Sequence, residues 1–349
     1  MTATRATGAY LRVDLGRIRA DIDTLRARIA PAQLMCVVKN DAYAHGIDRV
    51  VADVAAHGVE WVGTFDVPMG VRARAAAGPG VRIFSWVTVD RTEIATALEA
   101  GIELGVGDAG YLEQVAEVSA GRAAPVHLKI DTGLHRNGVR PEDWAAFVAR
   151  AAALEARGDI RVAGIWSHIA ETSDADDDRA RVDYHTAVDA ARAAGLRPEV
   201  LHLAASAAGY ARPEFRHDLV RFGAFCYGIR STDGPELPGI VPAATLLAPV
   251  AAVAADTVEV AYGSLDGLPS TLAGRVSVGT PGGARALLAV GETMLTVQAW
   301  PGAAVGDEVA VFGPGDRGES SATTLAEAIG TVGEEIMVRV SPLLPRRYV

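Results

Sequence analysis

The order of apolar runs along the chain is the feature that most restricts its fold. From residue 11 to about residue 230, short runs rich in β-branched residues alternate with longer stretches of helical period. This alternation predicts βα units and a parallel sheet, because parallel strands need a crossover connection that is usually a helix. An early example is the stretch in which Ile18, Ile22, Leu25 and Ile29 share one helix face.

Eight candidate strands occur in this region, and eight is the number that closes a (β/α)8 barrel. They are expected over residues 34–39, 60–64, 82–86, 102–106, 126–131, 161–168, 200–204 and 219–223. The predicted fold is therefore α/β, a TIM-like barrel. A doubly wound open sheet is the alternative that the same pattern allows.

The pattern changes beyond about residue 235, where prolines recur and short alternating segments are separated by Gly-rich turns. Segments such as 257–262, 275–278 and 308–312, with a turn at 279–283 and a short helix at 324–329, indicate a small antiparallel β domain. We therefore expect a barrel over residues 11–235 and a C-terminal antiparallel β domain over residues 236–349 that also takes in residues 1–10.

Composition narrows the class of function. The chain has 349 residues and a net charge of −10, so it has no global electrostatic reason to bind nucleic acid or an anionic membrane. Cys36 and Cys226 lie in apolar runs, which indicates core positions and no disulfide framework. With no apolar run long enough for a signal peptide or a membrane span, the expected location is cytoplasmic.

The polar residues at the carboxyl ends of the predicted strands are the candidate site, because a barrel builds its active site there. They are Lys39, Trp86, Lys129, Asp131, Arg136, His168, His202, Ser206, Arg221 and Gly223. Cations, imidazoles and a hydroxyl dominate this set although the chain as a whole is acidic. Such a combination suits an anionic ligand together with proton transfer.

Lys39 is the most informative of these residues. It ends an apolar run, where partial burial lowers the pKa of an amine and leaves it able to form a Schiff base. A lysine whose ammonium group extends into solvent at a strand end is the alternative.

Six segments, in this order, resemble the alanine racemase family of fold-type III enzymes, which use pyridoxal 5′-phosphate (PLP). They are residues 39–46, 129–139, 167–170, 202–208, 220–223 and 260–263. The resemblance covers essentially the whole chain, and five of the segments fall at predicted strand ends. It implies a PLP-dependent racemase that interconverts L- and D-amino acids.

The resemblance also implies roles in catalysis. Lys39 would carry the cofactor and act as base on one face of the substrate Cα, and Tyr262 of a partner subunit would act on the other. Such a tyrosine needs a depressed pKa, for which His168 and Arg136 are the expected cationic sources. Arg136 would also contact the substrate carboxylate, and Lys129 matches a position that is often carbamylated and then supports Arg136.

Cofactor binding is implied for a further set of residues. Arg221 would face the pyridine nitrogen, with His202 behind it, and the phosphate would be held by hydroxyls and backbone amides. The complete set implied to bind PLP is Lys39, Tyr43, Trp86, His168, His202, Ser206, Arg221, Gly223 and Ala224. The expected partners are a small amino-acid substrate and a second copy of the chain in a homodimer with shared active sites.

The chain departs from the family pattern around the entrance to the pocket. Ala205 stands where the family has Asn, Thr280 where an entrance Tyr is usual, Leu295 and Thr296 where a Cys-Met-Asp segment is usual, and Pro342 where a phosphate-binding Tyr is usual. These departures leave the identity of the amino acid open.

Two other functions remain as alternatives: a related PLP enzyme that decarboxylates or eliminates on a specialised amino acid, and a non-catalytic PLP-binding protein.

The acidic cluster at Asp174, Asp176, Asp177 and Asp178 is interpreted as a solvated loop, with no metal site.

Overall fold

The computed structural model describes residues 8–232, 234 and 236–349, and within these the chain divides into two compact units. The barrel unit comprises residues 25–39 and 47–223, and the β unit comprises residues 8–24, 40–46 and 224–349. Pro235, where the sequence places the domain boundary, lies outside the described residues.

The barrel unit contains a parallel sheet of eight strands, and each predicted strand is present at its expected place. They are β2 (Gln33–Val37), β3 (Trp61–Asp66), β4 (Arg82–Val87), β5 (Ile102–Val106), β6 (Ala124–Lys129), β7 (Ile160–Trp166), β8 (Val200–His202) and β9 (Leu219–Phe222). Their hydrogen-bonded order is β8-β7-β6-β5-β4-β3-β2-β9, with every pair parallel.

The sheet closes between its two end strands. The Asp218 amide donates to the Leu201 carbonyl at 3.1 Å, and the Arg221 amide donates to the Ala204 carbonyl at 3.2 Å. Closure and consecutive strand order confirm the TIM-like barrel and exclude the doubly wound open sheet, in which the strand order would reverse.

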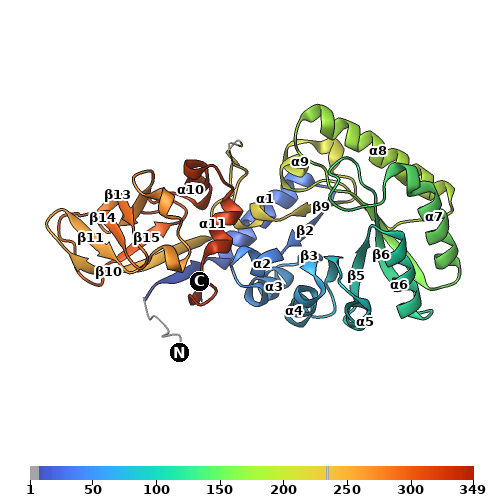
Figure 1. Ribbon diagram of the computed structural model, residues 1–349, viewed down its shortest axis with the longest axis horizontal. Helices are drawn as coiled ribbons and strands as arrows, with labels where there is room; N and C mark the ends of the chain where they lie inside the picture. The colour runs from blue at the N-terminus through green and yellow to red at the C-terminus, as the bar shows by residue number, and fades with distance from the viewer. Residues whose placement is uncertain (1–7, 233, 235) are drawn as a thin grey trace. The chain divides into compact units, whose positions relative to one another are not determined.

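Helices surround the barrel strands (Figure 1). They are α3 (Ile47–Ala56), α4 (Val67–Ala77), α5 (Arg91–Glu99), α6 (Ala109–Ser119), α7 (Pro141–Ala156), α8 (Asp174–Ala193) and α9 (Ser206–Ala211), while α1 (Leu15–Ile29) precedes β2. Three helices begin in the same way: the side chains of Asp66, Asp90 and Asp108 each accept from the backbone amide three residues later. These N-caps fix where the helices after β3, β4 and β5 begin.

The acidic cluster is an exception to the sequence prediction. Asp174, Asp176, Asp177 and Asp178 lie in the first turns of α8, capped by Ser173, and so the predicted loop is wrong. Their charges oppose the positive end of the helix dipole, which explains why an acidic run starts a helix here. Within the described chain, no group of three or more His, Cys, Asp or Glu side chains could hold a metal ion.

The β unit is built around a second sheet of eight strands, in the order β11-β14-β13-β12-β15-β10-β1-β16. The strands are β1 (Tyr10–Val13), β10 (Ala244–Val253), β11 (Thr257–Val260), β12 (Ser277–Thr280), β13 (Gly283–Val290), β14 (Leu295–Gln298), β15 (Glu308–Phe312) and β16 (Arg346–Tyr348). All pairs are antiparallel except β1 with β16.

The β unit confirms the predicted antiparallel β architecture and corrects some details. Two helices, α10 (Ala322–Ile329) and α11 (Gly333–Arg339), follow β15, and only the first is predicted from sequence. The predicted turn at 279–283 is shorter than expected, because Gly279 and Thr280 belong to β12 and Gly283 begins β13. None of the helices in the described residues has the length and apolar character that crossing a membrane requires.

Candidate active site

The carboxyl ends of the barrel strands bring together basic side chains that lie far apart in the sequence. Lys39 follows β2, Lys129 ends β6, His168 follows β7 and Arg221 lies in β9. The sequence contains two lysines, Lys39 and Lys129, among 33 lysines and arginines, and both are at this end of the barrel. Arginine keeps its proton near neutral pH, whereas a buried lysine can lose its proton. Lys39 and Lys129 are therefore the side chains that can supply an uncharged, nucleophilic amine.

Arg221 is the most firmly held of the cations. Its Nη1 donates to the His202 carbonyl at 3.1 Å, and its Nη2 donates to the carbonyls of Ser167 and Leu203 at 2.9 and 3.0 Å. The same two nitrogens lie 3.3 Å from His202 Nδ1 and 3.1 Å from His168 Nδ1. Burial lowers the pKa of Arg221 to about 10, so the side chain stays charged at neutral pH.

The Nε–H of Arg221 makes no hydrogen bond to the described residues. Among the described residues, five acceptors face the two Nη atoms and none faces Nε. Because both Nη atoms are already engaged, Nε–H is the donor of this guanidinium that a ligand could use.

His168 shows how strongly positive the site is. Burial lowers its pKa, and the charges of Arg221, Arg136, Lys129 and Lys39 lower it further, to about 3. The imidazole is therefore neutral at physiological pH. Four cations around one neutral ring form an electrostatic site for an anion.

Lys129 is buried beside the same cations. Its Nζ lies 4.5 Å from the centre of the Trp166 ring. Burial lowers the pKa of Lys129 to about 8, with further lowering by Arg221 and Arg136 and an opposing effect of Asp131. At pH 7 roughly a tenth of such an amine is uncharged, which is the form that reacts with electrophiles.

The loop that carries Arg136 is fixed by Asp131. The Asp131 carboxylate accepts from the backbone amides of Gly133 and His135 at 3.1 and 3.0 Å, and lies 3.0 Å from the His135 imidazole. Burial opposes ionisation, but these hydrogen bonds outweigh it and lower the pKa of Asp131. The carboxylate therefore holds the turn directly before Arg136.

The remaining predicted residues of the barrel unit lie at other strand ends. Ser206 begins α9, and its Oγ accepts from the Gly223 amide at 3.3 Å, which joins the loop after β8 to the end of β9. Trp86, near the end of β4, packs against Phe84 and Phe65, with ring centres 6.1 and 6.3 Å away.

Tyr43 belongs to the β unit and lies in an unusual turn. Asn40, Asp41, Ala42, Tyr43 and Ala44 all have positive φ, between 52° and 67°, and so form one left-handed turn directly after Lys39. Left-handed backbone costs L-residues roughly 1–2 kcal/mol each, which must be offset by contacts.

Side chains of the β unit supply those contacts. The buried His45 Nδ1 lies 2.9 Å from the carbonyls of Ala42 and Tyr43, and Arg346 Nε donates to the Ala44 carbonyl at 3.1 Å. The rings of Tyr43 and His45 pack on Tyr227, with centres 5.1 and 4.8 Å away. The turn is therefore held on several sides within its own unit.

Tyr262 and Ala224 are also in the β unit. Tyr262 is buried, and its hydroxyl donates to the Asp266 carbonyl at 2.9 Å. Burial raises the pKa of Tyr262 and Asp266 raises it further, while Arg346 lowers it. Among the residues that the structure describes, therefore, the charge of Arg346 favours ionisation of Tyr262. Ala224 begins a short 3-10 turn, Ala224–Tyr227, directly after Gly223.

The positions where the chain departs from the family pattern have structural partners of their own. Thr280 donates to the Gly283 carbonyl at 2.7 Å within its hairpin, and Thr296 donates to Glu259 at 3.0 Å across β11 and β14. Leu295 is buried, and Ala205 directly precedes α9.

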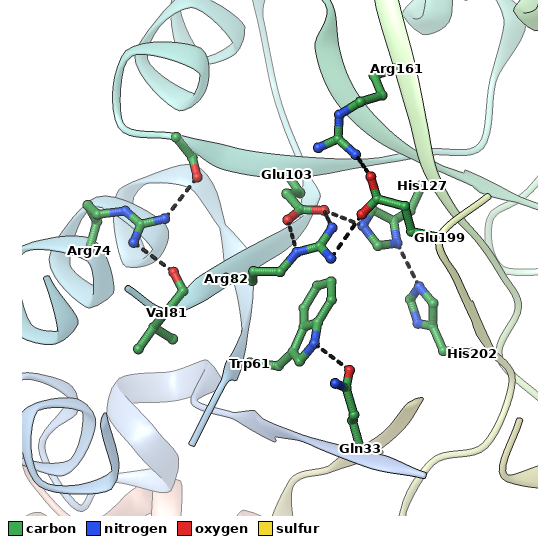
Figure 2. A network of polar contacts seen from close by, with 11 residues as sticks. Gln33, Trp61, Arg74, Val81, Arg82, Glu103, His127, Arg161, Glu199 and His202 are labelled. Carbon is green, nitrogen blue, oxygen red and sulfur yellow. Dashed lines mark hydrogen bonds and ion pairs between the residues drawn. The ribbon is translucent and has the colours of Figure 1, made fainter. Parts of the chain in front are cut away.

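Sequence reasoning missed a line of polar residues inside the barrel (Figure 2). It runs from His202 to His127 and then to Glu103 and Arg82, with the imidazoles 2.8 Å apart and His127 Nε2 2.8 Å from Glu103. A charged residue within the apolar run of β5 and a histidine two positions before Lys129 in β6 mark two of these positions in the sequence, but they do not show that the side chains meet.

Comparisons with known proteins match both units. The family model "Alanine racemase, N-terminal domain" matches residues 13–231, and "Alanine racemase, C-terminal domain" matches residues 250–348. Proteins named alanine racemase from Thermobifida fusca and Frankia casuarinae are 34% and 36% identical, over 97% of this chain and 98% and 95% of theirs. The solved alanine racemase from Streptomyces coelicolor A3(2) superimposes with a TM-score of 0.92 at 33% identity, covering 98% of each chain.

Proposed function

The chain belongs to the alanine racemase family, and from this membership we propose that it is a PLP-dependent enzyme that interconverts L- and D-alanine. One observation carries the proposal: the barrel gathers both lysines of the chain beside two arginines and a neutral imidazole, at the end where such barrels bind substrates. Proton transfer at Cα requires a group that gains and loses a proton, and lysine provides it.

The donor set of the barrel unit fits PLP. The cofactor carries a phosphate dianion and a pyridine nitrogen that accepts a hydrogen bond, and the unit offers an excess of cations and the unclaimed Arg221 Nε–H. Ser206 and the Gly223 amide would hold the phosphate, joined by Tyr43 and Ala224 of the β unit, while Trp86, His168 and His202 would surround the ring. When bound, PLP supplies an electron sink for the negative charge that forms at Cα.

Three residues of the barrel unit would then have different roles in the reaction. Lys39 would hold the cofactor and carry a proton to or from one face of Cα, and Arg136 would bind the substrate carboxylate through its planar guanidinium. Arg221 would donate a hydrogen bond without giving up its proton, since its pKa stays near 10. A pyridine nitrogen that receives only a hydrogen bond would make PLP a weaker electron sink than a protonated one. The weaker sink would favour return of the proton to Cα over other reactions.

Tyr262 would carry the proton on the opposite face. We propose that it acts from the second subunit of a homodimer, as the family resemblance implies, and that contact with the cations of that subunit's barrel offsets the effect of burial on its pKa. A cytoplasmic location and the absence of nucleic-acid or membrane partners remain part of this proposal.

The test is hydrogen exchange at Cα. Incubation of the enzyme with PLP and L-alanine in heavy water should give deuterated D- and L-alanine by chiral chromatography and mass spectrometry. Lys39→Ala should abolish exchange and binding of PLP, with Lys129→Arg as the matched control that keeps Lys39. If a product of different mass forms, the enzyme decarboxylates or eliminates; if a panel of amino acids shows no exchange, the chain is no racemase.

A further inference from the structure

The line of polar residues behind Arg221 offers an inference that rests on the proposed function and extends it to residues far from the substrate. Arg221 Nη1 faces His202 Nδ1, His202 Nε2 lies 2.8 Å from His127 Nδ1, and His127 Nε2 lies 2.8 Å from Glu103 Oε2. Glu103 then pairs with Arg82 through two contacts of 2.5 and 2.8 Å.

The line crosses the barrel from one end to the other. Arg82 begins β4 and Glu103 is the second residue of β5, whereas His202 ends β8. Glu103, His127 and His202 are buried, while Arg82 also pairs with the partly exposed Glu199, which in turn pairs with Arg161 (Figure 2).

Proton positions along this line follow from Glu103. Burial opposes its ionisation, but hydrogen bonds from His127 and Arg82 lower the pKa of Glu103 to about 2, so it is a carboxylate and accepts only. His127 must then carry its proton on Nε2. Burial lowers the pKa of His127 and of His202, so both rings are neutral and each has one N–H.

One N–H per ring leaves a single consistent arrangement. His127 Nδ1 has no proton and accepts from His202 Nε2–H, which leaves His202 Nδ1 as an acceptor for Arg221 Nη1. In the opposite tautomer, His202 Nδ1–H would point at a guanidinium N–H 3.3 Å away, and two donors would face each other.

The surrounding residues hold the rings in place. Trp166 stacks on His202 with an interplanar angle of 5°, and Phe84 lies edge-on to His202 at 5.3 Å and next to His127 at 4.7 Å. At Gly164 of β7, any Cβ would collide with the His127 ring, so the strand leaves room for the imidazole. The rings therefore cannot turn to adopt the other hydrogen-bonding pattern without repacking the core.

We propose that Glu103 and His127 are positioning residues of the active site: the Glu103 carboxylate fixes the tautomers of His127 and His202, which keeps Arg221 Nε–H directed at the cofactor-binding space. A carboxylate that orients a histidine is a recurrent device in active sites, and here it acts through two histidines in series. The orientation of Arg221, which would face the pyridine nitrogen, thus depends on the negative charge of Glu103 at the far end of the barrel.

The first experiment observes the tautomers directly and needs neither activity nor bound cofactor. In long-range proton–nitrogen correlation spectra of the ¹⁵N-histidine-labelled full-length protein, assigned by single substitutions, His127 and His202 should both be neutral with the proton on Nε2. A charged His127, or a proton on His202 Nδ1, overturns the proposal, whatever the racemase activity.

The second experiment changes the charge with little change of shape. Glu103→Gln gives His127 an amide group that can also donate, so a substantial fraction of His202 should move its proton to Nδ1. With PLP and alanine, kcat should fall about 10–100-fold with KM changed by about twofold or less. The matched control, Glu199→Gln, alters only the exposed end of the line and should preserve the tautomers and kcat.

The outcomes separate the two proposals. If the wild type racemises alanine and Glu103→Gln, shown to be folded by circular dichroism, keeps both tautomers and kcat, the positioning role is refuted and the racemase function stands. If the wild type has the expected tautomers but no racemase activity, the proposed function fails. If Glu103→Gln does not fold, the wild-type spectra alone decide between support and refutation.

Discussion

At the scale of single residues, the chain separates two kinds of cation by their chemistry. Arginine serves throughout the molecule, while both lysines lie at the carboxyl end of the barrel, and burial lowers the pKa of Lys129 to about 8. The charges of Arg221, Arg136 and the two lysines lower the pKa of His168, which is neutral. The contrast indicates that Lys129 is present for its reactivity as well as for its charge.

Lys129 gives a pH-dependent prediction about stability. Its pKa is about 8 in the folded protein and 10.5 when unfolded, so the unfolded chain binds more protons between these values and stability should rise with pH there. Lys129→Met removes the buried charge and should stabilise the protein without PLP by up to about 3 kcal/mol at pH 7, falling towards zero above pH 10. Urea unfolding across this range measures it; an equal gain at all pH values would contradict the assigned cause.

A second prediction at Lys129 concerns carbon dioxide. An amine with a pKa near 8 has enough of its uncharged form to become carbamylated, and the modified side chain would carry a negative charge beside Arg136. ¹³C-labelled bicarbonate should give a carbamate NMR signal that is absent in Lys129→Arg and retained in Lys39→Arg. A signal that instead disappears with Lys39 would assign the reactive amine to the other lysine.

At the scale of elements, the barrel strands and the helical stretches between them follow from the sequence, because short β-branched runs alternate regularly with longer stretches of helical period. The strand ends supply much of the candidate site for the same reason. The line behind Arg221 does not follow, since nothing local to Glu103 or His127 shows that β5, β6 and β8 point these side chains toward one another. The first turns of α8 were missed because acidic residues are typical of loops as well as of helix N-termini.

The left-handed turn after Lys39 was also beyond sequence reasoning, and it gives a prediction about stability. Asn40 is exposed with φ 52°, so its backbone conformation matters more than its packing. Asn40→Val should lower the free energy of unfolding by about 1–2 kcal/mol, because a β-branched residue is strained in this conformation. Asn40→Gly is the matched control and should unfold at nearly the wild-type urea concentration; if both variants behave alike, the turn is not left-handed in solution.

At the scale of the whole molecule, the proposed reaction needs residues from both compact units. Lys39 and Arg221 belong to the barrel unit, and Tyr262 and Tyr43 belong to the β unit. A β unit that donates Tyr262 to a second subunit would make catalysis a property of the dimer. The family membership supports this organisation, which two inactive variants can test.

Complementation between subunits is the expected result. Lys39→Ala and Tyr262→Phe should each lose most racemase activity, but mixed dimers contain one site with both intact residues. Refolding an equimolar mixture should therefore restore about a quarter of the wild-type activity, since half the dimers are mixed and each has one working site. Refolding each variant alone is the control; no recovery in the mixture would place both residues in the same subunit's site.

The scarcity of lysine also has a practical consequence for handling the protein. Amine-directed coupling reagents depend on lysines spread over the surface, and here Lys129 is buried and Lys39 lies at the mouth of the barrel. Apart from reaction at the α-amine, attachment to an amine-reactive support would therefore compete with loading of the proposed cofactor instead of occurring at lysines spread over the surface. Immobilisation through carboxylates, of which the acidic chain has an excess, should leave both amines untouched.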